Sequence, residues 1–195
     1  MKKIISLSKI FLGAGLLLFA MNSCKNEPKH DDPIESADEH NEAKFETKDI
    51  ADDASFLTDA ADINRKEIEI GKLALHKGTS PEVKKFAQTL IDDHTRSLEE
   101  LKAVASKNTI TLPEEISEEG REEYYKLNKL SASDFDKSFI NAMLEGHDKA
   151  VDKITEISQK ATNEEVKLWA SRQTSVFLAH HEEAKKLKEK IDNNL

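Results

Sequence analysis

Four stretches of the sequence place apolar residues at alternating steps of four and three, and this repeat constrains the fold more than any other feature. The spacing gathers the apolar side chains on one face of an α-helix, which is typical of helices that pack together in a bundle. The stretches cover residues 49–77, 81–107, 133–160 and 162–192. The sequence therefore predicts an all-α protein built on a four-helix bundle.

Short polar motifs mark where these helices start and stop. Ser80 followed by Pro81 predicts an N-cap and first residue for the second helix, and Gly78 predicts a left-handed end to the first. Two further motifs resemble capping boxes and would open the third and fourth helices, namely Ser133-x-x-Asp136 and Thr162-x-x-Glu165. The connection between the first two helices is short, so we expect these helices to be antiparallel neighbours.

Residues 108–132 interrupt the repeat. The pair Leu112-Pro113 breaks the helical pattern, and residues 114–130 are charged with few apolar side chains. We expect a long crossover that contains a short helix, placed between the second and third helices of the bundle.

The N-terminus resembles a bacterial lipoprotein signal. Lys2 and Lys3 precede an apolar run over residues 10–21, which is too short to span a membrane. Cys24 is the one cysteine of the chain, and it follows the small residue Ser23 at the end of this run. The pattern predicts a signal peptide over residues 1–23 and an envelope protein, most simply at the outer membrane, anchored by lipid on Cys24. The alternative is an ordinary cleaved signal beside an incidental cysteine.

Residues 24–48 are polar, contain two prolines and show no apolar repeat. This composition predicts a flexible acidic tether ahead of a bundle over residues 49–193. The formal net charge of −9 argues against nucleic acid as a partner. Nothing in the sequence identifies a protein partner.

Four polar residues occupy positions on the apolar stripes, one in each predicted helix: Glu67, His94, His147 and His180. A rise of about 1.5 Å per residue puts all four within about one turn of the middle of the bundle. Burying such groups is costly unless they are paired, so we expect the four side chains to converge. One carboxylate and three imidazoles can bind Zn, Fe, Mn or Cu. The alternative is a metal-free polar network that fixes the register of the helices.

Two aspartates adjoin these histidines, Asp93 beside His94 and Asp148 beside His147. Neighbours in sequence do not share a helix face, so we do not expect either aspartate to contact the metal. We expect each to hydrogen-bond to a ligating side chain or to face solvent.

Several segments together resemble the ferritin-like bacterial domain-of-unknown-function family 4142 (DUF4142). They are EIEIGKLALHKG at 67–78, VKKFAQTLIDDHT at 83–95, LSASDFDKSFINAMLEGHD at 130–148 and LAHHEEAKKL at 178–187. The resemblance covers about residues 52–190. It implies a ferritin-like bundle in an envelope protein, with family site positions at Glu67, His94, His147 and His180. The family usually has a Leu-Pro pair before the last histidine, where this chain has Ser175-Val176.

The ligand pattern of ferritin-like di-metal proteins is incomplete in this chain. Those proteins use a Glu-x-x-His motif on each of two helices. Here Ile91, Leu144 and Phe177 stand three residues before the histidines. A single metal ion, or a cluster without metal, therefore agrees better with the sequence than a di-iron centre.

Three hypotheses for the function follow. The leading one is an envelope lipoprotein that binds one metal ion in its core, for metal handling or envelope stress. The second is a structural or interaction lipoprotein with a metal-free network, and the third is a metal-dependent oxidoreductase. The sequence identifies no reaction and leaves open whether the protein is an enzyme.

Overall fold

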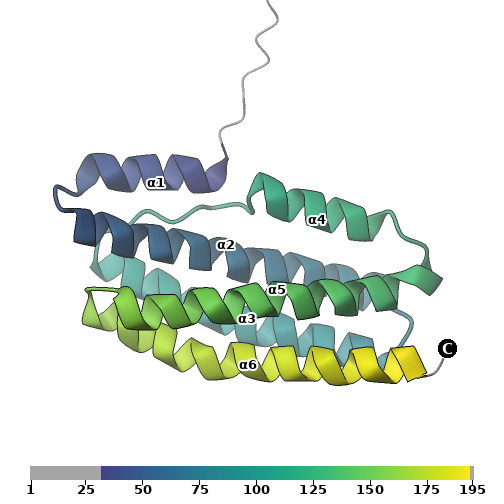
Figure 1. Ribbon diagram of the computed structural model, residues 1–195. Helices are drawn as coiled ribbons and strands as arrows, with labels where there is room; N and C mark the ends of the chain where they lie inside the picture. The colour runs from purple at the N-terminus through teal and green to yellow at the C-terminus, as the bar shows by residue number, and fades with distance from the viewer. Residues whose placement is uncertain (1–31, 194–195) are drawn as a thin grey trace, which may run out of the picture. The chain divides into compact units, whose positions relative to one another are not determined.

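Six α-helices and no strands make up residues 32–193, the part of the chain that the computed structural model describes (Figure 1). Their bounds are α1 (Pro33–Lys44), α2 (Lys48–Lys77), α3 (Pro81–Lys107), α4 (Glu118–Asn128), α5 (Ala132–Lys160) and α6 (Glu164–Asn193). The four long helices α2, α3, α5 and α6 are the four that the apolar repeat predicts, with ends that agree to within two residues. Within these residues, no helix combines the length and hydropathy needed to cross a membrane.

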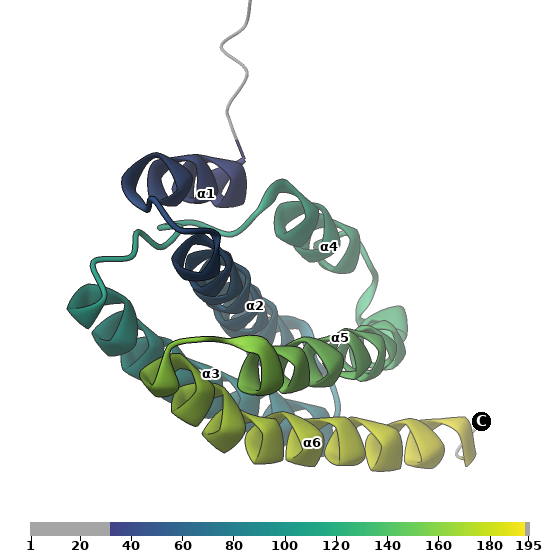
Figure 2. The ribbon, with the colours of Figure 1, turned by 60° about the vertical axis from the view of Figure 1, so that its left-hand side comes forward.

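The long helices form two antiparallel hairpins, α2–α3 and α5–α6, which pack against each other. Contacts of α2 with α5 and of α3 with α6 join the hairpins. The connection between α3 and α5 contains α4, where a short helix is expected. Both α1 and α4 pack on the outer side of α2 (Figures 1 and 2).

Helix α1 contradicts the prediction of a flexible tether over residues 24–48, which is wrong for residues 33–44. Asp32 accepts a hydrogen bond from the Ile34 amide and caps the helix. Ala37 and Asn41 are buried. The Asn41 side chain donates to the Thr111 carbonyl at 2.9 Å and accepts from the Thr111 amide at 2.8 Å. This helix buries only one small apolar residue and one amide and docks largely through polar contacts, which explains why it shows no apolar repeat. Residues 24–31, the predicted signal peptide and Cys24 lie outside the described part of the chain.

A polar layer divides the core of the bundle in two. One apolar cluster is centred on Leu57, Leu101 and Trp169, and the other on Leu90 and Phe139. Along each long helix, the residues of the two clusters lie on opposite sides of a short polar interval. The buried polar residues of that interval are Asn64, Glu67, His94, Ser97, His147 and His180.

The turn before α6 is held by an aspartate of the other hairpin. Asp53 in α2 is buried and accepts hydrogen bonds from the amides of Thr162 and Asn163, at 2.9 and 2.7 Å. Asn163 itself caps α6, because its side-chain oxygen accepts from the Glu165 amide at 2.8 Å. The predicted capping box is therefore wrong in its cap: Asn163 takes the role expected of Thr162.

A second aspartate makes the reciprocal contact. Asp136 in α5 accepts hydrogen bonds from the amides of Thr79 and Ser80, at 3.1 and 2.8 Å, in the turn before α3. It was expected to cap its own helix with Ser133, and this prediction is wrong because α5 already begins at Ala132, after Ser131. We call Asp53 and Asp136 the aspartate clamps. The amides that they bind lie at helix N-termini and lack partners inside their own helices.

Gly78 ends α2 without the predicted left-handed conformation, since its φ is −57°. A Cβ atom on Gly78 would lie 2.6 Å from the Ala74 carbonyl oxygen. A glycine is needed here because the backbone approaches closely, and not because φ is positive.

Candidate metal centre

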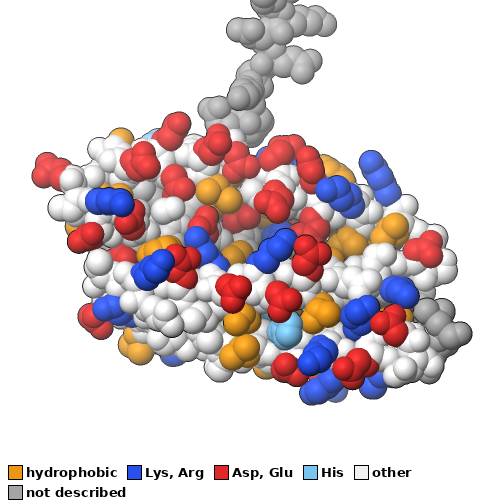
Figure 3. Space-filling view, in the orientation of Figure 1, with side chains coloured by type: hydrophobic (Ala, Val, Ile, Leu, Met, Phe, Trp, Pro, Cys, Tyr) orange, Lys and Arg blue, Asp and Glu red, His pale blue; other side chains and the backbone are white. Residues whose placement is uncertain are grey.

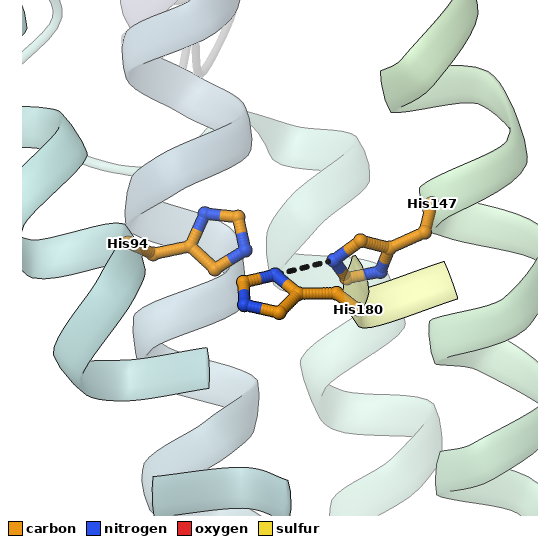
Figure 4. Close-up of side chains that lie close together, drawn as sticks. All are labelled: His94, His147 and His180. Carbon is orange, nitrogen blue, oxygen red and sulfur yellow. Dashed lines mark hydrogen bonds between the residues drawn. The ribbon is translucent and has the colours of Figure 1, made fainter. Parts of the chain in front are cut away.

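His94, His147 and His180 meet in the polar layer (Figure 4). They come from α3, α5 and α6, and each is buried. Each offers one ring nitrogen to a group whose atoms all lie within 4.8 Å of one another. The ring centroids lie 5.7 Å apart for His94–His147 and 5.2 Å apart for the other two pairs. The structure thus brings together three of the four residues that the sequence singles out.

In His147 and His180, the ring nitrogen that faces away from the middle of the three-histidine cluster contacts a hydrogen-bond acceptor of the protein. Nδ1 of His147 donates to the Met143 carbonyl at 2.9 Å, one turn earlier in α5. Nε2 of His180 lies 3.0 Å from a carboxylate oxygen of Asp93 in α3. A backbone carbonyl and a carboxylate accept hydrogen bonds, so we assign the ring protons to these two nitrogens.

Asn64 in α2 holds the third ring in the same way. Its side-chain nitrogen donates to the Ala60 carbonyl at 2.7 Å, which turns its oxygen toward His94. Nδ1 of His94 lies 3.0 Å from that oxygen and so carries the ring proton. Each histidine is thereby fixed in one tautomer by a group behind it.

The three inward nitrogens therefore carry lone pairs and no proton. Nε2 of His147 faces Nδ1 of His180 at 3.3 Å, and both are acceptors in the tautomers described above. Nε2 of His94 is buried and has no hydrogen-bond partner in the described part of the chain. A proton placed between His147 and His180 would make one ring an imidazolium or would break an outer hydrogen bond. A cation bound by all three nitrogens satisfies them together.

The pKa values of the three rings favour their neutral forms. Burial lowers the pKa of His147 to about 4, although the hydrogen bond to Met143 opposes the shift. Burial also holds the pKa of His94 well below its ordinary value, and His147 and His180 add to the effect. The pKa of His180 is lowered by burial as well, against the opposing hydrogen bond of Asp93. Neutral imidazole is the form that binds a metal ion.

Glu67 is the predicted site residue that the structure leaves outside this group. Its carboxylate is buried beside the histidines but does not belong to the set of convergent ligand atoms. One of its carboxylate oxygens is buried and has no hydrogen-bond partner among the residues that the structure describes. Burial raises the pKa of Glu67 to about 7, and Lys66 opposes the shift. A metal-free network that includes Glu67 would need this carboxylate to pair with an imidazole, and no such hydrogen bond is present among residues 32–193.

The sequence analysis does not identify Asn64 as a hydrogen-bond partner of a site histidine, but its expectations for Asp93 and Asp148 agree with the structure. Asn64 was missed, although it lies three residues before Glu67 on the same helix face. Asp93 contacts a histidine of the cluster through its carboxylate, as expected, but that histidine is His180 and not the adjacent His94. Asp148 contacts His181 near the surface, with its oxygen 2.8 Å from Nε2.

Comparisons with known proteins agree with this fold. Residues 37–187 match the sequence profile of DUF4142, described as a domain of unknown function. The structure is similar to the crystal structure of a DUF305 fragment from Deinococcus radiodurans, with a TM-score of 0.64 and 14% sequence identity. That similarity covers 74% of this chain and 97% of the fragment, and at this identity it shows the fold alone. No curated protein matches the sequence.

Proposed function

The chain belongs to the DUF4142 family, and from the geometry of its core we propose that it binds one transition-metal ion through His94, His147 and His180. The observation that carries the proposal is the convergence of three buried imidazole lone pairs whose outer nitrogens are all fixed by other groups. Second contacts of this kind orient the ligand rings in metal sites and make them better ligands.

The donor set narrows the choice of metal among Zn, Fe, Mn and Cu. Imidazole nitrogen suits Zn, Cu and Fe, whereas Mn prefers carboxylate oxygen. Since the Glu67 carboxylate lies outside the convergent group, the set favours the first three ions. Three histidines leave one coordination position open for water or for a further ligand. The proposed role is metal handling in the cell envelope.

We infer that the bundle is ferritin-like, since two antiparallel hairpins joined by one long crossover are typical of that class. The similarity to the DUF305 fragment supports the arrangement of the helices. The Glu-x-x-His motifs of di-metal ferritin-like proteins are absent at all three histidines, which supports a site for one ion.

Thermal melting of protein purified without a histidine tag tests the metal site. Zinc at 100 times its Kd should stabilise the native state by about 2.7 kcal/mol, which is roughly 5–10 °C in Tm for a chain of this size. His94→Ala and His147→Ala should lose this shift, because each removes one of three ligands. His181→Ala is the matched control and should keep it, since His181 contacts Asp148 outside the site.

Absence of any shift with Zn, Cu or Fe in the unaltered protein would reject the metal site. The second candidate function, a structural network that fixes the register of the helices, would then remain. The hydrogen bonds of Asn64 with His94 and of Asp93 with His180 are the observations that favour it.

We also propose that the protein is anchored in the cell envelope by lipid on Cys24. The support is the basic and apolar run that ends at this cysteine. Labelling with radioactive palmitate should mark the unaltered protein and not Cys24→Ala. Palmitate labelling of Cys24→Ala would contradict the anchor.

A further inference from the structure

A cleft of about 770 Å³ opens between α1, α2, α4 and α5, and the Glu67 carboxylate lies in its wall. Acidic side chains in the lining outnumber lysines by eight to four, so the cleft attracts cations. Charged side chains gather on this face of the molecule, among them many acidic ones (Figure 3). Two hydrogen bonds of Asp32 hold the rim, one to the Ile34 amide in α1 and one to the Glu118 amide in α4.

Glu67 and Gly146 connect this cleft with the three histidines. Both line the cleft, and Gly146 directly precedes His147 in α5. A Cβ atom on Gly146 would lie 3.5 Å from a carboxylate oxygen of Glu67 and would meet no other heavy atom within 4 Å. The missing side chain therefore leaves this carboxylate open to the cleft. Glu67 is only 2% exposed, and its other oxygen has no hydrogen-bond partner within residues 32–193, which is costly for a buried acceptor.

Two other approaches to the histidines are less favourable to an ion. Along the bundle axis, the two apolar clusters cover the polar layer from both sides. Between α3 and α6, the Asp93 carboxylate is occupied by His180 and by Arg96, at 3.0 and 3.2 Å. An ion arriving there would have to displace both partners.

We propose that metal ions reach the three histidines through this cleft, and that the Glu67 carboxylate is the first buried group to bind them on the way. The proposal rests on the metal site proposed above and adds its route of access. In the cleft, the Glu67 carboxylate replaces a water molecule bound to the ion. The ion then moves from the carboxylate to the imidazole nitrogens. In this role the carboxylate gains a partner only during passage, which accounts for its unpartnered oxygen.

Stopped-flow measurements with Co²⁺ test the route, because cobalt bound by histidines absorbs visible light. Association is measured by mixing metal-free protein with Co²⁺, and release by mixing the loaded protein with excess chelator. Gly146→Val places two methyl groups against Glu67 and narrows the route. Since ions enter and leave by the same path, both rates should fall by about tenfold while Kd stays within about twofold.

Ala179→Val is the matched control, because Ala179 is exposed and directly precedes His180 as Gly146 precedes His147. It should change neither rate. Gly146→Ala adds a methyl at ordinary contact distance from Glu67, so it should fold normally and slow both rates by a smaller factor even if Gly146→Val does not fold. Unchanged rates in the folded Gly146 variants would overturn the route.

Glu67→Gln separates a passing contact from a permanent ligand. An ion in passage lies nearer to Glu67 than the bound ion does, so loss of the charge should slow association and should not speed release. Faster release with a weaker Kd would make Glu67 part of the final site and overturn its role in passage. Failure of the unaltered protein to bind Co²⁺, together with no thermal shift with Zn, Cu or Fe, would instead reject the metal site, and the route with it.

Discussion

At the scale of single residues, Asn64 is the group that orients His94 in the proposed metal site. Its oxygen holds the proton of His94 on Nδ1 and so leaves Nε2 free for a metal ion. Asn64→Ala should weaken Zn binding by about 10- to 100-fold, as losses of such second contacts do. Isothermal titration of Zn measures the change. Ser97→Ala is the control, because Ser97 is buried in the same layer and its hydroxyl makes no hydrogen bond within the described residues. Equal losses in both variants would show that the layer responds to any substitution.

Glu67 gives the metal-free protein a distinct pH dependence. Its pKa rises from 4.5 to about 7 on folding, so the unfolded chain loses this proton at a lower pH than the native state does. The group therefore lowers the free energy of unfolding as pH rises from 4.5 to about 7, by a total on the order of 3 kcal/mol. Glu67→Gln removes this loss. Its stability relative to the unaltered protein should increase between pH 5 and pH 8 in urea titrations with chelator present.

Glu69 supplies the control for that measurement, since its side chain is 45% exposed and pairs with Lys72 at the surface. Glu69→Gln should show no comparable gain between the two pH values. A Glu67→Gln difference that stays constant with pH would mean that the carboxylate is already ionised in the native protein.

The sequence locates the histidines because helical rise alone fixes their height in a bundle. It could not show that Glu67 falls outside the ligand group, since that depends on which way each side chain turns. Nor could it show that the Met143 carbonyl binds His147, because a backbone acceptor has no signature in the sequence. Asn64, in contrast, has a signature in the sequence, since it is an amide on the same helix face as Glu67.

At the scale of elements, the Asp53 clamp should contribute strongly to stability. It is buried and satisfies two backbone amides that α6 cannot satisfy itself. Asp53→Ala should lower the free energy of unfolding by about 3 kcal/mol, because hydrogen bonds to a charged acceptor are lost and buried amides stay unpaired. Urea denaturation measures this. Asp52→Ala is the control and should change stability by less than about 0.5 kcal/mol, since Asp52 is exposed. A small effect at Asp53 would mean that water replaces the carboxylate.

The long helices were predictable because each carries a strong apolar repeat, and α1 was not because it carries none. Its docking depends on Asn41 meeting the backbone of Thr111, which lies 70 residues away. The predicted capping boxes are wrong for a similar reason, because contacts between residues far apart in the sequence replace the local ones. Asp136 has the spacing of a local cap, yet a turn from the other hairpin is a better-placed donor.

At the scale of the whole described bundle, the two hairpins are joined in a reciprocal manner. Asp53 of the first hairpin binds the turn of the second, and Asp136 of the second binds the turn of the first. The two contacts lie at opposite ends of the bundle, since one is near the start of α2 and the other near its end. The three-histidine cluster lies between them, with side chains drawn from both hairpins. The sequence predicts the four long helices, but no local motif predicts these two contacts between the hairpins.

The reciprocal clamps have a consequence for amide hydrogen exchange. Amides in surface turns usually exchange quickly, through local fraying that leaves the rest of a protein intact. Here the amides of Ser80 and Asn163 are each bound by a carboxylate of the opposite hairpin. Fraying of either turn therefore breaks a contact between the hairpins, and both amides should exchange more slowly than those of ordinary surface turns. Asp53→Ala should speed exchange at Asn163 and leave Ser80 unchanged, so that each turn reports on the contact made by the opposite hairpin.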